Sequence, residues 1–204
     1  MEVQPGQGLK GGRFLFPLTI MGLCLVVYAR SSLMDLLVYN RQAVLGGELW
    51  RLLTGHLVHF SLSHLILNML GFSLAVWIAW QRRCEHLVLL TFLAACFIGV
   101  AILLGQPNMA VYGGMSGLVN AVMVYVACLG LWVRGRWRSL SWTLLVLCLG
   151  TVIYEAATGR PALAVSDAIP FVPAPLAHIV GGMTGAFLAL WEKSFLGVRV
   201  KVPV

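Results

Sequence analysis

Long apolar stretches separated by short polar segments dominate the chain. An α-helix needs roughly 20 apolar residues to cross the bilayer core, and six stretches come close to or exceed this length. They predict membrane-spanning helices at about residues 14–29, 56–80, 86–104, 115–133, 140–155 and 176–191. The third and fourth are separated by Gly105-Gln106-Pro107-Asn108, which has turn chemistry. We therefore expect an all-α membrane protein, with residues 1–204 forming a single six-helix domain.

The composition also indicates a membrane environment. Hydrophobic residues make up 60% of the 204 residues and charged residues only 10%, whereas a soluble domain has about 25% charged residues. So few polar side chains cannot cover a water-facing surface, which argues against a soluble or disordered protein. The net charge of +7 comes from Lys and Arg residues scattered between the apolar stretches. We therefore expect membrane lipid, and no nucleic acid, as a partner.

The Lys and Arg residues predict the orientation of the helices. With six crossings, ten of the 14 lie on the side of both chain termini, and four lie on the other side: Arg30, Arg41, Arg51 and Arg160. Loops on the cytoplasmic side carry an excess of these residues. Both termini are therefore expected in the cytoplasm.

Neither the cysteines nor the histidines predict a metal site. The five cysteines include no Cys-x-x-Cys pair, so we expect small buried hydrophobic residues instead of disulfides or ligands. His59 and His64 would lie about 140° apart around an ideal helix, and no His-Glu-x-x-His motif is present. We expect no metal or other cofactor, and expect His56 and His59 to brace the connection before the second helix.

Polar side chains gather at the starts of the second, fourth and sixth predicted helices. Such groups are costly inside a bilayer and are often functional. His64 and Asn68 share a face of the second helix, and Ser116 and Asn120 share a face of the fourth. His178 begins the sixth helix. Because alternate helices enter the membrane from the same side, we expect all three groups at a similar shallow depth on the non-cytoplasmic side.

These residue types suit acyl transfer to a serine. Gly181 and Gly185 lie beneath His178 on the sixth helix and let a neighbouring backbone approach closely. Contact with the fourth helix would bring Ser116 within reach of His178. A base that accepts the hydroxyl proton activates a serine as a nucleophile. Polar side chains of the second helix, with the backbone amide that begins the fourth, supply the donors that an oxyanion needs.

Each of these signals has an ordinary structural explanation on its own. Ser116 could be a helix-packing residue in a chance Gly-x-Ser-Gly match, and His178 could be satisfied at an interface between helices. The coincidence of nucleophile, base and oxyanion donors at one depth favours a reaction centre, with no Asp or Glu nearby to form a transport pathway. A transporter or channel would need charged residues along a path across the bilayer, and Glu155 is the only acid within a predicted helix.

Four motifs resemble those of the rhomboid intramembrane serine proteases. They are Glu48-Leu-Trp50-Arg51, the spacing of His59, His64 and Asn68, Gly114-Met-Ser116-Gly117, and Ala177-His178-x-x-Gly181-x-x-x-Gly185. The motifs extend over most of the chain and are far more specific together than singly. The resemblance implies a six-helix rhomboid-like bundle that cleaves transmembrane substrates.

The resemblance also implies a role for each matched residue. Ser116 would be the nucleophile and His178 the base of a dyad without an acidic third member. The oxyanion hole would be lined by Asn68, His64, the Ser116 amide and Gly117. Trp50 and Arg51 would hold the first loop at the membrane surface, and His59, Gly114, Gly181 and Gly185 would support the centre.

Two positions depart from the family pattern. His56 stands three residues before His59, where many members place a histidine four residues before, so the role of His56 stays open. Asn120 stands where rhomboids often have a tyrosine packed under the base. We expect Asn120 to orient His178 through a hydrogen bond that favours one tautomer.

Within the family, the compact chain and the segment Thr54-Gly-His-Leu-Val-His-Phe-Ser are most similar to the rhombosortase branch. That branch is associated with bacterial proteins bearing a C-terminal sorting signal of Gly-Gly, an apolar helix and a basic tail. The similarity implies a multi-pass protein of the bacterial inner membrane, with its active site facing the periplasm and such proteins as substrates. The proline-rich segment from Gly159 to Pro175, with the fifth helix, is expected to act as a gate.

A catalytically silent rhomboid-like protein is the alternative interpretation. Such a protein would bind and escort transmembrane helices without cleaving them. It needs no catalytic dyad, so the complete pair of Ser116 and His178 argues against it.

Overall fold

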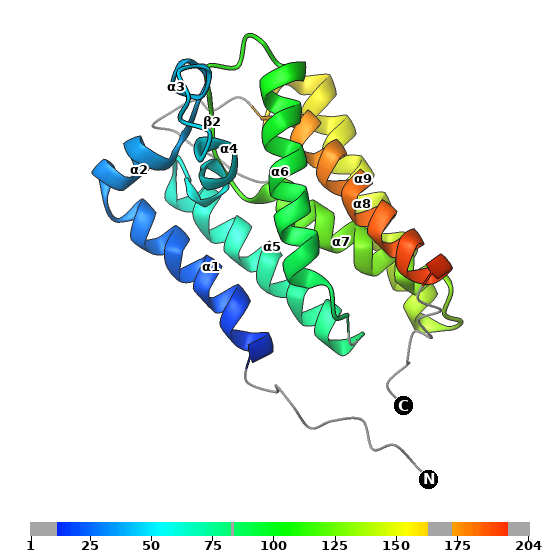
Figure 1. The fold of residues 1–204 in the computed structure, drawn as a ribbon. Coiled ribbons are helices and arrows are strands. Elements are labelled where there is room, and N and C mark those ends of the chain that lie inside the picture. The colour runs from blue at the N-terminus through cyan, green and yellow to red at the C-terminus, as the bar shows by residue number, and fades with distance from the viewer. Residues whose placement is uncertain (1–11, 83, 163–172, 196–204) are drawn as a thin grey trace.

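Six long helices make up most of the described chain, which comprises residues 12–82, 84–162 and 173–195 of a computed structural model. They are α1 (Gly12–Tyr28), α5 (Leu62–Gln81), α6 (Leu87–Gly105), α7 (Ser116–Leu131), α8 (Arg136–Thr158) and α9 (Pro175–Phe195). Each overlaps one of the six predicted stretches. The first residues of α1 and the last residues of α9 lie at the same end of the bundle (Figure 1).

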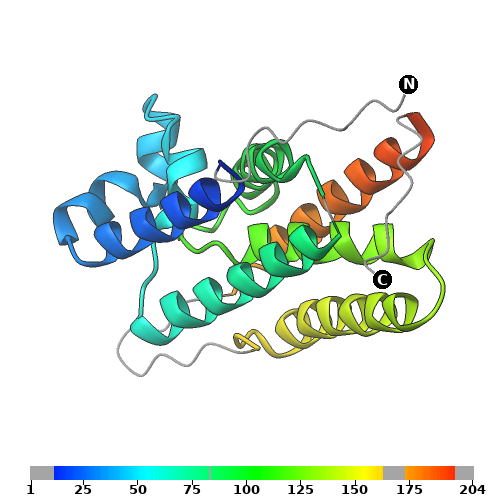
Figure 2. The same cartoon turned by 90° about the horizontal axis from the view of Figure 1, so that it is seen from below.

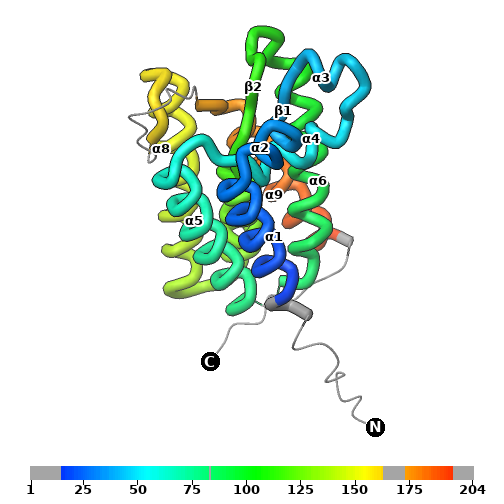
Figure 3. Tube along the Cα trace, turned by 90° about the vertical axis from the view of Figure 1, so that its left-hand side faces the viewer, coloured from blue at the N-terminus to red at the C-terminus, as the bar shows by residue number. Residues whose placement is uncertain are grey.

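The opposite end of the bundle carries short elements that the apolar pattern does not predict (Figure 3). They are α2 (Ser31–Leu37), β1 (Tyr39–Asn40), α3 (Arg41–Leu45), α4 (Arg51–Thr54), the 3-10 helix η1 (Gly55–Leu57) and β2 (Val111–Tyr112). β1 pairs with β2 in antiparallel fashion, with Tyr39 opposite Tyr112. This pairing ties the first loop to the segment that leads into α7.

The second long helix begins later than expected. We predicted a helix from about residue 56, but α5 starts at Leu62, so that boundary was wrong. The oxygen of the Ser61 side chain accepts a hydrogen bond of 3.2 Å from the backbone N–H of His64 and caps the helix start. His56 and His59 therefore precede the helix and lie in the connection.

α7 occupies the centre of the bundle, where α5, α6, α8 and α9 all contact it (Figure 2). Its sequence is apolar or small on nearly every side, and ten of its 16 residues are buried, as expected for a helix enclosed by others. A helix of this length spans about 24 Å, less than the roughly 30 Å of a bilayer core. By length alone, α7 is therefore too short to cross the whole bilayer core.

By length and composition, three helices of the described chain could each cross a membrane: α5, α6 and α8. The number rises to four if α1 and α2, which are bent by 113° at their junction, count as one broken span. The protein is therefore a multi-pass, mostly helical membrane protein. The count of six crossings and the cytoplasmic position of both termini stay predictions.

Candidate active site

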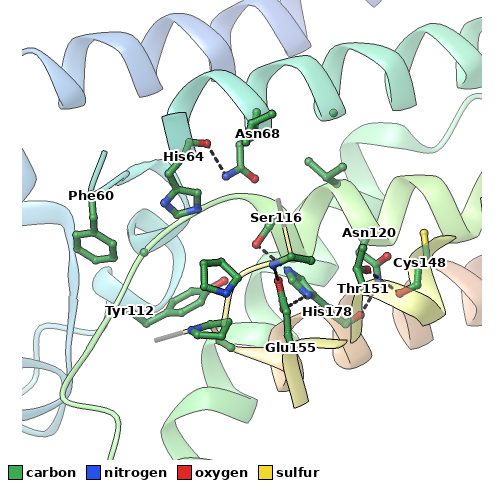
Figure 4. Close-up of a pocket in the computed structure, with 18 of the residues that line it drawn as sticks. Phe60, His64, Asn68, Tyr112, Ser116, Asn120, Cys148, Thr151, Glu155 and His178 are labelled. Atoms are coloured by element: carbon green, nitrogen blue, oxygen red, sulfur yellow. Dashed lines mark hydrogen bonds and ion pairs between the residues drawn. The ribbon is translucent and has the colours of Figure 1, made fainter. Parts of the chain in front are cut away.

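Ser116 and His178 meet where the first turn of α7 contacts the first turn of α9. Nε2 of His178 lies 2.8 Å from Oγ of Ser116 (Figure 4). This distance is within hydrogen-bond reach and allows a proton to pass from the hydroxyl to the ring. The two residues lie 62 positions apart in the sequence, so the packing of the two helices creates the pair.

Glycines on α9 let the two helices come this close. A methyl group at Gly181 would overlap the backbone oxygen of Gly117, and one at Gly185 would overlap the backbone oxygen of Ala121. The close contact predicted between the fourth and sixth helices is therefore present. Gly117, expected in the oxyanion hole, lies in this contact and is buried.

A carboxylate also reaches His178, contrary to the expectation that no acid lies near this site. Oε2 of Glu155, near the end of α8, is 3.0 Å from Nδ1 of His178. The two atoms are buried and not aligned for a hydrogen bond, so the contact is electrostatic; neither has a hydrogen-bond partner among the described residues. From the sequence alone, Glu155 is an isolated acid within a predicted helix. Its place near the helix end, at the depth of Ser116, was the signal that could have found it.

Asn120 contacts His178 differently from our expectation. Its Nδ2 donates a hydrogen bond of 2.6 Å to the backbone carbonyl oxygen of His178, not to the imidazole ring. Asn120 therefore positions the backbone of this residue. Ring nitrogen Nδ1 faces Glu155 instead, because α8 approaches His178 from the side of that nitrogen.

The predicted oxyanion donors of α5 lie beside the same centre. His64 and Asn68 line one cavity with Ser116 and His178, and Nδ2 of Asn68 donates to the backbone oxygen of His64 over 2.9 Å. Gly114 has a φ of +120°, and a side chain there would lie 2.7 Å from the His64 ring. Glycine is required at this turn both for its backbone conformation and for the space next to His64.

His56 and His59 brace the connection before α5. The ring nitrogens of His56 lie 3.2 Å from the backbone oxygen of Ala95 and 3.4 Å from that of Gly114. The His59 ring packs edge-on against the His64 ring, with centroids 5.0 Å apart. Burial lowers the pKa of His56, and burial together with the nearby His64 lowers the pKa of His59 to about 3. Both side chains are therefore neutral at pH 7.

Trp50 and Arg51 hold the first loop together. Nη1 of Arg51 donates to the backbone oxygens of Asp35 and Val38, each over 2.8 Å, and its Nε donates to Glu48 over 2.7 Å. Nε1 of Trp50 donates to the backbone of α2 over 3.4 Å. A single guanidinium thus links three parts of this loop.

A cavity of about 1080 Å³ opens beside the Ser116 and His178 pair. Its polar end holds His64, Asn68 and Asn120, and it continues as an apolar channel between α5 and α8 past Leu74 and Leu144. This volume is slightly above that of ordinary ligand sites, which reach about 1,000 Å³, so the cavity has room for several residues of an extended peptide. Residues 163–172 of the predicted gate lie outside the described residues.

Comparison with known proteins identifies the family. A model of the rhomboid domain matches residues 46–194, well over half of the chain. The chain belongs to the rhomboid family. The matched range contains every site residue described above, from Trp50 to Gly185.

Three rhomboid proteases of Salmonella are distant relatives of this rhomboid. The rhomboid proteases GlpG of Salmonella paratyphi A, Salmonella typhi and Salmonella newport are each 32% identical to it over 153 residues. The aligned region covers 65% of this chain and 52% of each relative. The chain therefore spans about half the length of the curated relatives it matches.

Proposed function

We propose that this rhomboid is an intramembrane serine endopeptidase, with Ser116 as nucleophile and His178 as general base. The observation that carries the proposal is the 2.8 Å distance between Ser116 Oγ and His178 Nε2, in the wall of a large cavity. A silent escort protein would have no need for a hydroxyl and an imidazole at this distance.

The reaction follows from this geometry. Ser116 Oγ attacks the scissile carbonyl carbon while the hydroxyl proton passes to Nε2 of His178. The attack converts the substrate carbonyl into a tetrahedral oxyanion. The oxyanion collapses, the C–N bond breaks, and His178 returns the proton to the leaving amine. Water then attacks the acyl-enzyme, again with His178 as base, and releases Ser116.

The oxyanion is stabilised by donors that are already in place. The first backbone N–H groups of a helix have no partner within that helix, and Ser116 and Gly117 carry two of them at the start of α7. The partial positive charge of a helix start favours an anion there. Side chains of His64 and Asn68 face this position across the cavity.

A substrate helix reaches the cavity between α5 and α8. Only 17% of the apolar segment of α8 is buried in the bundle, against 44% of the corresponding segments of α5 and α6. Moving α8 outward therefore exposes a smaller share of buried residues than moving α5 or α6 would. The substrate must also unwind locally, because the carbonyls inside a helix are hydrogen-bonded.

The narrower proposal is that the substrates carry the C-terminal Gly-Gly sorting signal and are cut near the periplasmic face of the bacterial inner membrane. Support comes from the likeness of the segment from Thr54 to Ser61 to rhombosortases. Glycine is also among the residues least favourable to a helix, by about 1 kcal/mol relative to Ala. A Gly-Gly pair next to an apolar helix therefore unwinds readily into the extended form that Ser116 can attack.

Labelling with a fluorescent fluorophosphonate tests the proposed chemistry. We expect the purified wild-type protein to be labelled, Ser116→Ala to lose labelling, and His178→Ala to be labelled far more slowly. Ser73→Ala is the matched control, because this serine lies on α5 and contacts Met21 away from the cavity. Equal labelling of all four proteins would reject the site.

Cleavage of a reporter tests the substrate class. The reporter carries Gly-Gly, an apolar helix and a basic tail at its C-terminus, and the comparison reporter has Leu-Leu in place of Gly-Gly. We expect cleavage of the first reporter by the wild type, and not by Ser116→Ala. Cleavage of both reporters without preference would support the protease and reject the narrower assignment.

A further inference from the structure

Glu155 reaches the His178 ring at the nitrogen that Ser116 does not use. Its Oε2 lies 3.0 Å from Nδ1, while Ser116 Oγ lies 2.8 Å from Nε2 on the other side of the ring. The side chains of His178 and Glu155 are only 12% and 8% exposed, so water screens their interaction weakly. Figure 4 shows the side chains of Ser116 and Glu155 gathered beside that of His178.

We infer that Glu155 is a positioning residue that fixes the orientation and tautomer of the His178 ring and stabilises the charge that the ring gains during the reaction. The inference rests on the proposed function, because it assigns a role in the same proton transfer. It also replaces the expected dyad with a three-residue arrangement contributed by α7, α9 and α8.

The tautomer argument follows from the two ring nitrogens. A neutral imidazole carries one N–H, and Nε2 must be without a hydrogen to accept the proton of Ser116. The hydrogen must then be on Nδ1, which faces the Glu155 carboxylate. An anion at this position favours that tautomer over the inactive one and attracts the imidazolium that forms when the proton arrives.

Glu155 is itself held in place. Its second oxygen, Oε1, accepts a hydrogen bond of 3.2 Å from the backbone N–H of Ala162. Gly159, in a left-handed conformation, ends α8 between these two residues. The chain after α8 therefore folds back over the carboxylate and keeps it directed at the ring.

The charges around the ring come from few groups. The titratable groups that face His178 are His64 from α5, Ser116 from α7 and Glu155 from α8, and His64 interacts electrostatically with both His178 and Glu155. α6 also contacts α9 but carries no charged side chain, and Cys96 is its only titratable group. Within the described chain, Glu155 is thus the only anion beside the ring.

The test measures fluorophosphonate labelling rates of the full-length protein over about pH 5 to 9, with thermal unfolding of each variant alongside. We expect Glu155→Gln to label at least about tenfold more slowly at pH 7. The acidic limb of its pH–rate profile should move to lower pH, because the protonated ring has lost its counter-charge. Glu155→Asp retains the charge, so it should recover part of the rate and keep the limb near its wild-type position.

Glu192→Gln provides the matched control. Glu192 is another buried carboxylate that contacts a histidine ring, with Oε1 2.6 Å from Nδ1 of His86, but it lies near the far end of α9. Loss of this carboxylate should lower the unfolding temperature without moving the limb.

The outcomes separate the possible failures. A Glu155→Gln protein with the rate and limb of the wild type overturns the inference and leaves the proposed function standing. A uniform loss at every pH that Asp does not rescue also overturns it, since that result marks a purely structural anchor. If Glu155→Gln does not fold, the test depends on Glu155→Asp. An acidic limb that moves away from its wild-type position in this variant counts against the inference. A wild-type protein without Ser116-dependent labelling overturns the proposed function instead.

Discussion

Asn120 donates a hydrogen bond of 2.6 Å from α7 to the backbone carbonyl oxygen of His178 on α9. The bond lies one turn beyond Ser116 and fixes the backbone of the residue whose ring contacts the serine. Glycine at position 182 leaves room for it, since a methyl group there would lie 3.2 Å from the Asn120 amide nitrogen. Asn120 therefore sets the height of His178 relative to Ser116 without touching the ring.

Asn120→Ala should slow labelling of Ser116 several-fold and lower the free energy of unfolding by about 1 kcal/mol, the usual value of one hydrogen bond. The carbonyl of His178 loses its donor, and the ring is held less firmly at the serine. Labelling rate and thermal unfolding in detergent measure the two effects. Thr143→Ala, which removes an exposed hydroxyl bonded to its own helix, should change neither, and an unchanged rate in Asn120→Ala would contradict this role.

Gly181→Ala should abolish most labelling of Ser116. The added methyl group would overlap the backbone oxygen of Gly117, so α9 must move away and carry His178 with it. A displacement of about 1 Å at a reacting group can cost about 100-fold in rate.

Gly150→Ala is the control for this substitution. Gly150 also lies inside a long helix, but a methyl group there meets no atom within 4 Å. This variant should label at the wild-type rate and unfold at the same or a slightly higher temperature, because Ala favours a helix more than Gly does. If both variants label equally, the tight contact between α7 and α9 is not what positions the base.

The parts of this fold that the sequence predicts are those with a local signal. Apolar stretches locate the long helices because a helix placed in a bilayer or inside a helix bundle is apolar along most of its length. The pairing of Ser116 with His178 was also accessible, because Gly181 and Gly185 mark the face of the last helix that another backbone approaches.

The features that the sequence does not predict depend on contacts between residues far apart in the chain. Tyr39 pairs with Tyr112, and nothing in either local sequence indicates the other. Glu155 reaches His178 only because of the way α8 is rotated and placed beside α9, which apolar composition alone does not determine. The start of α5 at Leu62 had a local signal in the Ser61 cap, but the apolar residues before it extended the predicted helix too far.

Arg51→Lys should destabilise the first loop. The guanidinium donates to Asp35, Val38 and Glu48 at once, and an ammonium group cannot reproduce this planar, forked geometry. Hydrogen bonds to charged groups contribute about 1.5 to 3 kcal/mol each, so we expect the free energy of unfolding to fall by roughly 2 kcal/mol. Thermal unfolding measures this loss, and the exposed Arg30 supplies the control Arg30→Lys, which should unfold like the wild type. Equal unfolding temperatures for the two variants would rule out this bracing role.

Stability should decrease as the pH falls below about 6.5, the ordinary pKa of histidine, because of His59 and His56. Burial lowers the pKa of His59 to about 3 and also lowers that of His56. Between pH 6.5 and about pH 3, the unfolded chain therefore binds a proton at His59 that the folded chain does not. The part of the free energy of unfolding that depends on these neutral histidines is fully present above pH 6.5. Below that pH it decreases by up to about 1.4 kcal/mol per pH unit for each histidine.

Replacing His59 separates its effect from that of other titrating groups. Stability can depend on pH through more than one titratable group, so the wild-type slope alone does not identify the histidine. His59→Phe retains a flat ring beside His64 and cannot take up a proton, so its unfolding temperature should depend less steeply on pH from about 4 to 6.5. Parallel curves for the two proteins would show that His59 does not need to stay neutral for the connection before α5 to hold.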